Sequence, residues 1–296
     1  MPTAMTISKE WEKLLRELSS GRHMRIIYIL GGSDRGKTTF CRYLAEELSH
    51  LFITAYIDCD SGQATIGPPT TIGMSLRAGG RTREEVFLRF VGSTTPVGHM
   101  LPEIVSAQRL VGKANSFTAR RIIMDSSGFV FGPMASEFQF QFIDLIRPDH
   151  IVVIRKGDEL EDLMRGIEKR KGLQVHYFNA AAEVKARTPK ERSDYRSARF
   201  EEYFRNAAIQ TLSYSGLGMH GRVPDFESPD EEDWGNRIIA VETAEVFTAA
   251  LGILKSIDAA GQKISFLAPP FNAETAAFVH FGSIYMDSAG EFRRCK

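Results

Sequence analysis

The chain has 296 residues, of which 43% are hydrophobic and 25% charged, a composition typical of a folded protein that can bury a sizeable core. Basic and acidic residues each number 37, and this zero net charge argues against a protein that coats long nucleic acids, though not against one that grips a strand end. Three scattered cysteines and the lack of an apolar run of ~20 residues argue against disulfides and a membrane span, so we expect a cytoplasmic protein.

The predicted elements begin with an amphipathic helix in residues 1–22, because Trp11, Leu14 and Leu18 fall on one side. From residue 23 to about 208, short runs rich in β-branched residues alternate with longer stretches of helical period. This alternation predicts an α/β domain with a mostly parallel sheet, covered by helices on both faces. The expected strands are Ile26–Leu30, Ile53–Ile57, Val86–Phe90, Arg121–Met124 and His150–Ile154, and the expected helices are Lys37–Leu48, Leu101–Ala114, Glu137–Leu145 and Asp158–Glu168.

The pattern changes beyond Ile209. A segment rich in glycine, aspartate and proline, Gly216–Trp234, precedes several short apolar runs. We therefore expect a small β-rich domain in residues 209–296. Its expected strands are Ile238–Val241, Thr248–Ile253, Lys263–Leu267 and Phe278–Ile284.

A glycine-rich loop follows the strand Ile26–Leu30. Its sequence, Gly-Gly-Ser-Asp-Arg-Gly-Lys-Thr-Thr, matches the phosphate-loop pattern G-x-x-x-x-G-K-[ST] between a predicted strand and a predicted helix. Backbone N–H groups of such a loop bind phosphate oxygens, so we expect an ATP site in which Lys37 reaches the β- and γ-phosphates and Thr38 ligates Mg²⁺. The expected nucleotide-binding residues are Gly31, Gly32, Ser33, Asp34, Arg35, Gly36, Lys37, Thr38 and Thr39.

A second motif, Asp58-Cys-Asp-Ser-Gly-Gln63, follows the strand Ile53–Ile57. A carboxylate at the carboxyl end of a strand beside the phosphate loop is where an NTPase holds Mg²⁺ or its waters. In an extended chain Asp58 and Asp60 point to the same side, so one can serve the metal while the other faces an attacking hydroxyl. An acidic turn without a catalytic role is the alternative, and the phosphate loop upstream favours the functional interpretation.

These motifs together resemble the polynucleotide 5′-hydroxyl kinase family, P-loop RNA kinases related to the kinase subunit of the pre-mRNA cleavage machinery and to the ribosomal-RNA-processing kinase. Phe90–His99 is similar to the family's substrate-clasp segment, and Ile123–Phe129 to a strand end that carries a Trp. His99 stands where an Asn is expected, and Phe129 replaces the Trp. Phe129 still offers a ring for base stacking, worth ~1–3 kcal/mol. The chain resembles a short, prokaryotic-type member.

Residues 186–205 resemble the family's lid helix. Arg192 and Arg196 are four residues apart and share one helix face, and Arg187 precedes a Thr-Pro helix start. Arginines over a γ-phosphate stabilise the charge that spreads in the transition state. The alternative is a solvated helix face whose arginines pair with nearby acidic residues.

The resemblance implies an ATP-dependent, Mg²⁺-dependent kinase that transfers the γ-phosphate to the 5′-hydroxyl end of RNA, or of DNA. Asp60 would take the proton from the hydroxyl. The implied catalytic residues are Lys37, Asp60, Arg192 and Arg196, the metal-binding residues are Thr38 and Asp58, and the substrate-binding residues are Gln63, Thr95, Phe129 and Arg187.

Two other classes of protein remain open. A regulatory GTPase of an RNA-processing assembly would carry Asn-Lys-x-Asp to read guanine, and Arg155-Lys-Gly-Asp158 differs from it only at the Asn. Asp158 is as easily the N-cap of the next helix. A nucleotide-binding scaffold without turnover would not need an acceptor-facing base such as Asp60.

Overall fold

The computed structural model describes residues 8–21, 23–181, 184–226, 234–286 and 292–294. The chain forms two compact units that are interleaved in sequence. The first comprises Met1–Cys59, Met74–Val86 and Ala107–Ala186, and the second comprises Asp60–Gly73, Phe87–Ser106 and Arg187–Lys296. The sequence places one boundary near residue 209, whereas the second unit begins its last segment at Arg187 and also takes two short segments from the first half of the chain.

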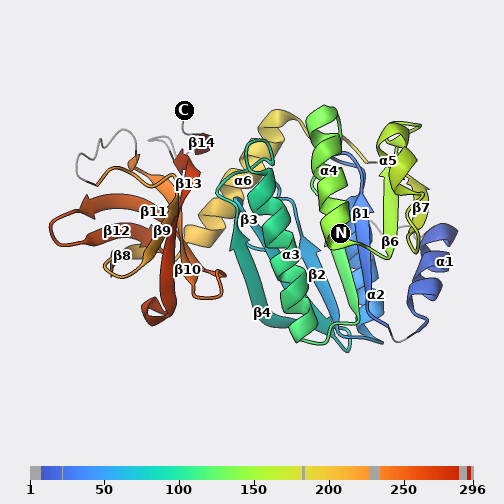
Figure 1. Ribbon diagram of the computed structural model, residues 1–296, viewed down its shortest axis with the longest axis horizontal. Helices are drawn as coiled ribbons and strands as arrows, with labels where there is room; N and C mark the ends of the chain where they lie inside the picture. Colours follow the sequence, from blue (N-terminus) through green and yellow to red (C-terminus); the bar gives the residue numbers. More distant parts are fainter. Residues whose placement is uncertain (1–7, 22, 182–183, 227–233, 287–291, 295–296) are drawn as a thin grey trace. The chain divides into compact units, whose positions relative to one another are not determined.

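A seven-stranded sheet has the order β4-β3-β2-β5-β1-β6-β7. β1 pairs in parallel with β5 and β6, β2 pairs in parallel with β5, and β6 does so with β7. The predicted α/β fold with a mostly parallel sheet is confirmed (Figure 1). The strands are β1 Arg25–Leu30, β2 Thr54–Asp58, β3 Thr71–Ala78, β4 Arg81–Phe90, β5 Arg121–Asp125, β6 His150–Arg155 and β7 Gln174–Asn179.

β3 and β7 are strands that the sequence interpretation missed. β3 and β4 are separated only by Gly79 and Gly80, both with positive φ (58° and 73°). Two such residues form the tight turn of an antiparallel hairpin. The Gly-Gly pair beside alternating apolar residues was therefore a usable signal for β3, whereas β7 is polar and half exposed and carries no strong pattern.

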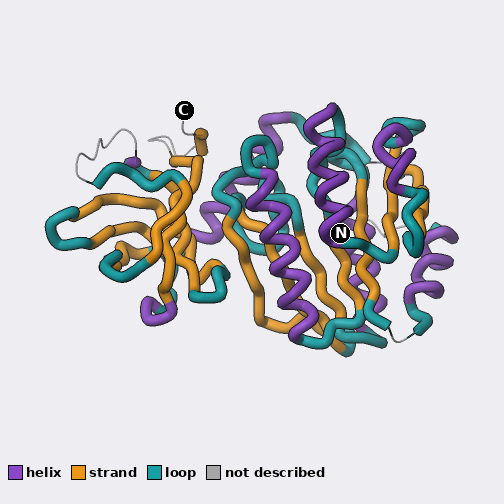
Figure 2. Tube along the Cα trace, in the orientation of Figure 1, coloured by secondary structure: helices purple, strands orange, loops and turns teal. Residues whose placement is uncertain are grey.

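Helices cover both faces of this sheet. α4 (Pro133–Ile146) crosses one face, and α2 (Lys37–Ser49) packs against β1, β2 and β5 on the other (Figure 2). α1 (Lys9–Leu18) packs on α2, with the Trp11 ring 4.6 Å from that of Phe40. The helix expected within residues 1–22 is therefore present as Lys9–Leu18, and residues 1–7 lie outside the described residues. The other helices are α3 Met100–Ser116, α5 Glu161–Ile167 and α6 Pro189–Phe204.

A second seven-stranded sheet has the order β14-β13-β10-β11-β12-β8, with β9 paired to β13. Its two sides carry separate apolar cores, one around Phe266 and Phe281 and one to which α6 contributes Phe200. The predicted β-rich region is confirmed, and part of the glycine-, aspartate- and proline-rich segment Gly216–Trp234 forms β9. The strands are β8 Ala208–Ser213, β9 Gly218–Gly221, β10 Arg237–Thr243, β11 Thr248–Asp258, β12 Lys263–Ala268, β13 Ala276–Met286 and β14 Phe292–Arg294, with a 3₁₀ turn at Ala273–Thr275.

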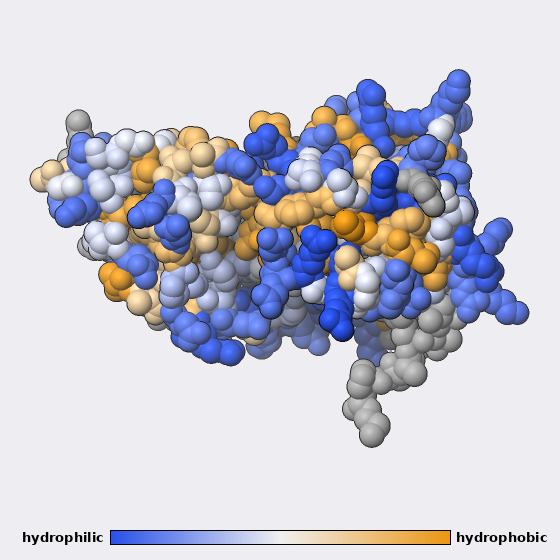
Figure 3. All heavy atoms as spheres, turned by 90° about the horizontal axis from the view of Figure 1, so that it is seen from below, coloured by the Kyte–Doolittle hydropathy of each residue, from blue (hydrophilic) through white to orange (hydrophobic). Residues whose placement is uncertain are grey.

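The surface is mixed. Figure 3 shows hydrophilic side chains spread over the visible face, with apolar ones between them, as expected from the composition. None of the described helices is both long enough and apolar enough to span a membrane. Cys41 and Cys59 are buried free thiols, so no disulfide joins them.

Candidate active site

The phosphate loop connects the buried strand β1 to α2, which begins at Lys37. Gly36 is the N-cap of α2 with φ 87°, a left-handed conformation that favours glycine. No side chain caps this helix end. The first N–H groups of α2 are therefore available to an anion, which is the arrangement that binds phosphate at a helix N-terminus.

A second glycine allows the chain after β5 to approach the loop closely. A Cβ atom on Gly128 would lie 2.7 Å from the backbone nitrogen of Ser33 and would collide with it. Gly128 belongs to the segment predicted to resemble a strand end of the kinase family. The segment and the phosphate loop are therefore packed against each other by a contact that only glycine permits.

Lys37 lies on the first turn of α2 and is buried. Its Nζ donates a hydrogen bond to the Gly32 carbonyl at 2.9 Å, so the ammonium group lies over the loop. Thr38 is half-buried and Thr39 exposed at the same helix end. These placements match those expected for a lysine and a hydroxyl that serve a nucleotide and its metal.

Arg35 is held by a partner that the sequence analysis missed. Its guanidinium donates two hydrogen bonds to Glu159, at 2.9 and 2.8 Å. The hydrogen bond with Glu159 raises the pKa of Arg35, and the same bond holds the pKa of Glu159 below its usual value. This two-pronged ion pair ties the phosphate loop to the segment after β6, so Arg35 has a positioning role in the loop.

Two carboxylates face each other where β2 and β5 end. Asp58 and Asp125 are directly paired in the parallel register, and each is 2% exposed. The Tyr56 hydroxyl donates to Asp125 Oδ2 at 3.1 Å. Asp125 lies within the Ile123–Phe129 segment, and no role was predicted for it. Its position at the end of a strand that was itself predicted was the signal that could have identified it.

Asp60 lies in the turn that follows β2. Its Oδ1 accepts hydrogen bonds from the N–H groups of Gly62, at 3.0 Å, and Gln63, at 2.8 Å. These bonds fix the turn and the direction of the carboxylate. Gln63 Nε2 donates to the Arg192 carbonyl at 3.3 Å, so the Asp60 turn and α6 are in contact within the second unit.

Glu103 supports this turn from α3 and was also missed. The Ser61 hydroxyl donates to Glu103 Oε1 at 2.7 Å. Burial raises the pKa of Glu103 to about 8, and the nearby charge of Asp60 acts in the same direction. Glu103 is therefore protonated near neutral pH, and it contacts Ser61, the neighbour of Asp60 in the chain. An isolated glutamate in a helical stretch gives no sequence signal for this placement.

Helix α6 carries the predicted lid arginines. It starts with a complete capping box between Thr188 and Glu191, a signal present in the sequence. Arg196 is half-buried; burial lowers its pKa, while the charge of Asp60 opposes that shift. Arg187 is exposed, with its guanidinium 5.7 Å from the centre of the Tyr195 ring. The structure thus brings Asp60, Gln63, Arg192 and Arg196 together within the second unit.

The second half of α6 is anchored. The Tyr195 hydroxyl donates to the Ala64 carbonyl at 2.9 Å, and Arg199 donates to the Gly67 carbonyl at 2.8 Å. Phe200 is 1% exposed in the core that also contains Phe90. Two of the acidic residues near the lid arginines have other partners: Asp194 pairs with Lys190, and Glu191 caps the helix.

The segment expected to clasp substrate forms a series of local turns. The Thr95 N–H donates to Ser93 at 3.3 Å, and Thr95 Oγ1 accepts from Val97 at 3.4 Å. His99 Nε2 is 2.9 Å from the Ser283 hydroxyl on β13. The histidine that replaces the family's Asn is therefore held by the second sheet.

Phe129 is half-buried, and its ring lies 5.9 Å from that of Phe138 on α4. Phe131, two residues on, is 52% exposed and packs near Gly32 of the phosphate loop. The sequence analysis selected Phe129 by family resemblance and did not consider Phe131, which presents more of its ring to solvent.

The near match to a guanine-reading motif has other contacts. The Arg155 guanidinium lies 4.6 Å from the centre of the Tyr177 ring and 3.5 Å from Glu161. The interpretation of Asp158 as a helix N-cap is wrong, because α5 begins at Glu161 with Leu160 as its N-cap. The backbone between Asp158 and Glu161 forms a turn before the helix instead.

The parallel sheet and the loop between β1 and α2 define a P-loop protein. Residues 31–206 match the family described as the mRNA cleavage and polyadenylation factor CLP1 P-loop. The match covers more than half of the chain, and the chain belongs to this family. The resemblance to P-loop RNA kinases inferred from the sequence is confirmed.

Named relatives extend the match over most of the chain. The polyribonucleotide 5′-hydroxyl-kinase of Methanocaldococcus jannaschii is 25% identical over 90% of this chain and 88% of its own. The one from Thermococcus kodakarensis is 32% identical over 71% of this chain and 60% of its own. A chain of the wild-type Clp1p–Pcf11p complex has the same fold, with a TM-score of 0.71 and 15% identity over 94% of this chain and 79% of its own.

Proposed function

We propose that this protein is an ATP-dependent polynucleotide 5′-hydroxyl kinase that acts on RNA ends. The observation that carries the proposal is the uncapped α2 N-terminus behind a complete phosphate loop, in a chain whose relatives are named polyribonucleotide 5′-hydroxyl-kinases. The buried free thiols of Cys41 and Cys59 are compatible with the reducing cytoplasm in which we place the protein.

The phosphate loop would bind the nucleotide. Backbone N–H groups of residues 31–39 would hold the phosphates of ATP, and Lys37 would neutralise charge on the β- and γ-phosphates. Mg²⁺ prefers oxygen ligands, and the buried Asp58 at the end of β2 together with the Thr38 hydroxyl provides them. The bound ion would neutralise charge that develops on the phosphate oxygens.

The turn that contains Asp60 would bind the 5′-hydroxyl end that accepts the phosphate. Asp60 would accept the proton of the 5′-hydroxyl while that oxygen forms its bond to the γ-phosphorus and ADP leaves. Gln63, Thr95 and Arg187 would contact the acceptor strand, and Phe129 would stack on its terminal base. The two N–H donors on Asp60 support this role because they fix the carboxylate in one orientation.

Arg192 and Arg196 would stabilise the transition state. Arginine fingers in related systems contribute roughly 10³–10⁵ in rate. Arg196 is half-buried and lies near the charge of Asp60, which supports a place for its guanidinium beside the acceptor-side carboxylate.

The proposal is tested by incubating the protein with γ-labelled ATP and matched RNA oligonucleotides that end in a 5′-hydroxyl or a 5′-phosphate. We expect label on the hydroxyl-ended RNA and none on the phosphate-ended RNA. A DNA oligonucleotide with a 5′-hydroxyl, assayed in parallel, shows whether DNA is also an acceptor. GTP in place of ATP separates the kinase from the regulatory GTPase. Slow GTP hydrolysis with no labelled acceptor would favour the GTPase.

A further inference from the structure

Three side chains outside the proposed active site meet on the second sheet: His220 on β9, Glu242 on β10 and His280 on β13. We call them the His–Glu–His cluster. His280 is paired directly with His220 across the parallel β9–β13 ladder and with Ala240 across the antiparallel β10–β13 ladder. Glu242 is two residues beyond Ala240, so all three side chains lie on the same face.

The backbone at Glu242 is irregular on both sides. The register of β10 shifts at Glu242 against β11 and again between Glu242 and Thr243 against β13. Such bulges re-aim a side chain and are common beside functional sites. The irregularity therefore directs the Glu242 carboxylate toward the two imidazoles.

The distances are those of a ligand set. Glu242 Oε2 lies 3.0 Å from His220 Nε2, and Oε1 lies 3.7 Å from His280 Nδ1. The two imidazole centres are 4.0 Å apart, and one ligand atom from each of the three residues lies within 4.8 Å of the others. Phe90 packs edge-on against His280 at 4.9 Å and fixes that ring.

Glu242 is buried beside the two imidazoles. Its side chain is 1% exposed, and its ion-pair partners among the described residues are the two histidines. A buried carboxylate is stabilised by a nearby positive charge, and a metal ion held by the three side chains would supply one.

We propose that the His–Glu–His cluster binds a divalent transition-metal ion, with Zn²⁺ the best fit. Two imidazole nitrogens and one carboxylate oxygen form a three-ligand set typical of zinc, and a fourth position remains for water. The His220 side chain is 42% exposed, which provides an entry path for the ion. The ion would occupy the space between His220 Nε2, His280 Nδ1 and a Glu242 oxygen.

The metal would have a structural effect. β9 has four residues and pairs only with β13 in the described sheet. A metal held by His220 and Glu242 would link β9 to β10, a strand with which it shares no backbone ladder. Zinc should therefore stabilise the second unit and raise its unfolding temperature.

A similar group in the first unit provides an internal comparison. Glu17, His150 and His176 also lie within ligand distance of one another, but the two imidazoles hydrogen-bond to each other at 3.1 Å. Glu17 is 35% exposed, so water can solvate its charge. This group has no buried carboxylate.

The test is zinc binding by untagged, chelator-treated protein, measured by calorimetry and by the shift in melting temperature. We expect one Zn²⁺ per chain for the wild type, for His176→Ala and for the exposed-site control His23→Ala. His220→Ala and Glu242→Gln should lose more affinity than the roughly 10–100-fold typical of supporting residues. Zinc should raise the melting temperature of the wild type but not of these two variants.

His220 is partly exposed and Gln is isosteric with Glu, so both variants should fold; melting in chelator checks this. Co²⁺ gives a second measurement, because intense visible absorption marks four- or five-coordinate cobalt. The spectrum should be present in the wild type and absent in His220→Ala. Wild-type zinc affinity in His220→Ala, loss of the site in His176→Ala, or no stoichiometric binding by the wild type would each overturn the proposal.

Discussion

At the residue scale, two carboxylates only two positions apart occupy different local structures. Asp58 is the last residue of β2, buried and paired with Asp125, whereas Asp60 lies in a turn and accepts two backbone hydrogen bonds. The extended-chain geometry assumed from the sequence does not describe this pair, because the strand ends between them. The different surroundings support different roles, with Asp58 toward the metal and Asp60 toward the acceptor.

Asp60→Asn tests this division. The amide keeps the oxygen that accepts the Gly62 and Gln63 N–H groups, so the turn and the ATP affinity should be preserved. Transfer to the 5′-hydroxyl should fall by about 10²–10⁴, as is typical when a general base is lost. Steady-state transfer rates and ATP titration measure both quantities. Normal transfer by Asp60→Asn together with an inactive Asp58→Asn would reverse the assignment.

Lys37→Ala should abolish transfer and weaken ATP binding. The ammonium group lies over the loop, and its charge stabilises phosphate in both the ground state and the transition state. Binding of a fluorescent ATP analogue and transfer rates check the two effects, and Arg42→Ala, which removes an exposed cation further along the same helix, is the matched control. Kinase activity at the wild-type level in Lys37→Ala would remove this loop from the active site.

Glu103 should make stability depend on pH. Its pKa is raised to about 8 by burial, so the folded protein keeps a proton that the unfolded chain loses near its ordinary value of 4.5. The free energy of unfolding should therefore fall as the pH rises from about 4.5 to about 8. Urea unfolding across this range should show a steeper fall for the wild type than for Glu103→Gln. Equal slopes would contradict a protonated Glu103.

At the scale of elements, α6 combines a charged first half with an anchored second half. Its start was readable in the sequence because Thr188, Pro189 and Glu191 form a capping signal. Its anchors were not readable. The partners of Tyr195 and Arg199 are carbonyl groups more than a hundred residues away, and no local pattern encodes such contacts.

Arg192→Ala and Arg196→Ala should lower transfer strongly while leaving the fold intact, because α6 is held by other residues. The lost interaction is transition-state charge stabilisation, so background ATP hydrolysis should fall as well. Lys190→Ala on the same helix removes an exposed pair with Asp194 and is the control. Hydrolysis and transfer rates decide the matter, and arginine variants that behave like Lys190→Ala would show that the helix is merely a solvated surface.

The predicted strands and helices of the first sheet were recovered because their apolar periods are strong, as in β1 and α2. The sequence did not predict the pairing of Asp58 with Asp125 or the ion pair of Arg35 with Glu159, because these contacts depend on strand order and on loop packing.

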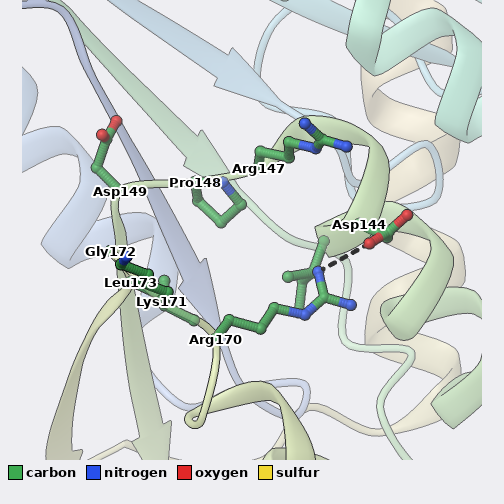
Figure 4. Close-up of a pocket in the computed structure, with 9 residues that line it drawn as sticks. Asp144, Arg147, Pro148, Asp149, Arg170, Lys171, Gly172 and Leu173 are labelled. Carbon is green, nitrogen blue, oxygen red and sulfur yellow. Dashed lines mark ion pairs between the residues drawn. The ribbon is translucent and has the colours of Figure 1, made fainter.

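A basic patch in the first unit shows the same limit. Arg147, Arg170 and Lys171 line a pocket of about 600 Å³, where Arg170 pairs with Asp144 (Figure 4). No pattern in the sequence predicts that these basic residues line one pocket.

At the scale of the whole molecule, each unit combines segments that the sequence order separates. The phosphate loop and Asp58 belong to the first unit, whereas Asp60, Thr95 and the arginines of α6 belong to the second. A composition change near residue 209 is visible in the sequence, but the transfer of Asp60–Gly73 and Phe87–Ser106 to the second unit is not. Those segments join it through long-range contacts such as the bond from Ser283 to the Gly92 carbonyl.

The central claim is that the γ-phosphate of ATP is moved onto a 5′-hydroxyl, and the position of the transferred phosphate tests it most directly. RNA with a 5′-hydroxyl is incubated with γ-labelled ATP and the protein, then digested completely to 5′-mononucleotides. We predict that all label on the RNA is recovered in the first nucleotide, and that Lys37→Ala gives none. Label released only as inorganic phosphate, or found at internal nucleotides, would contradict the account.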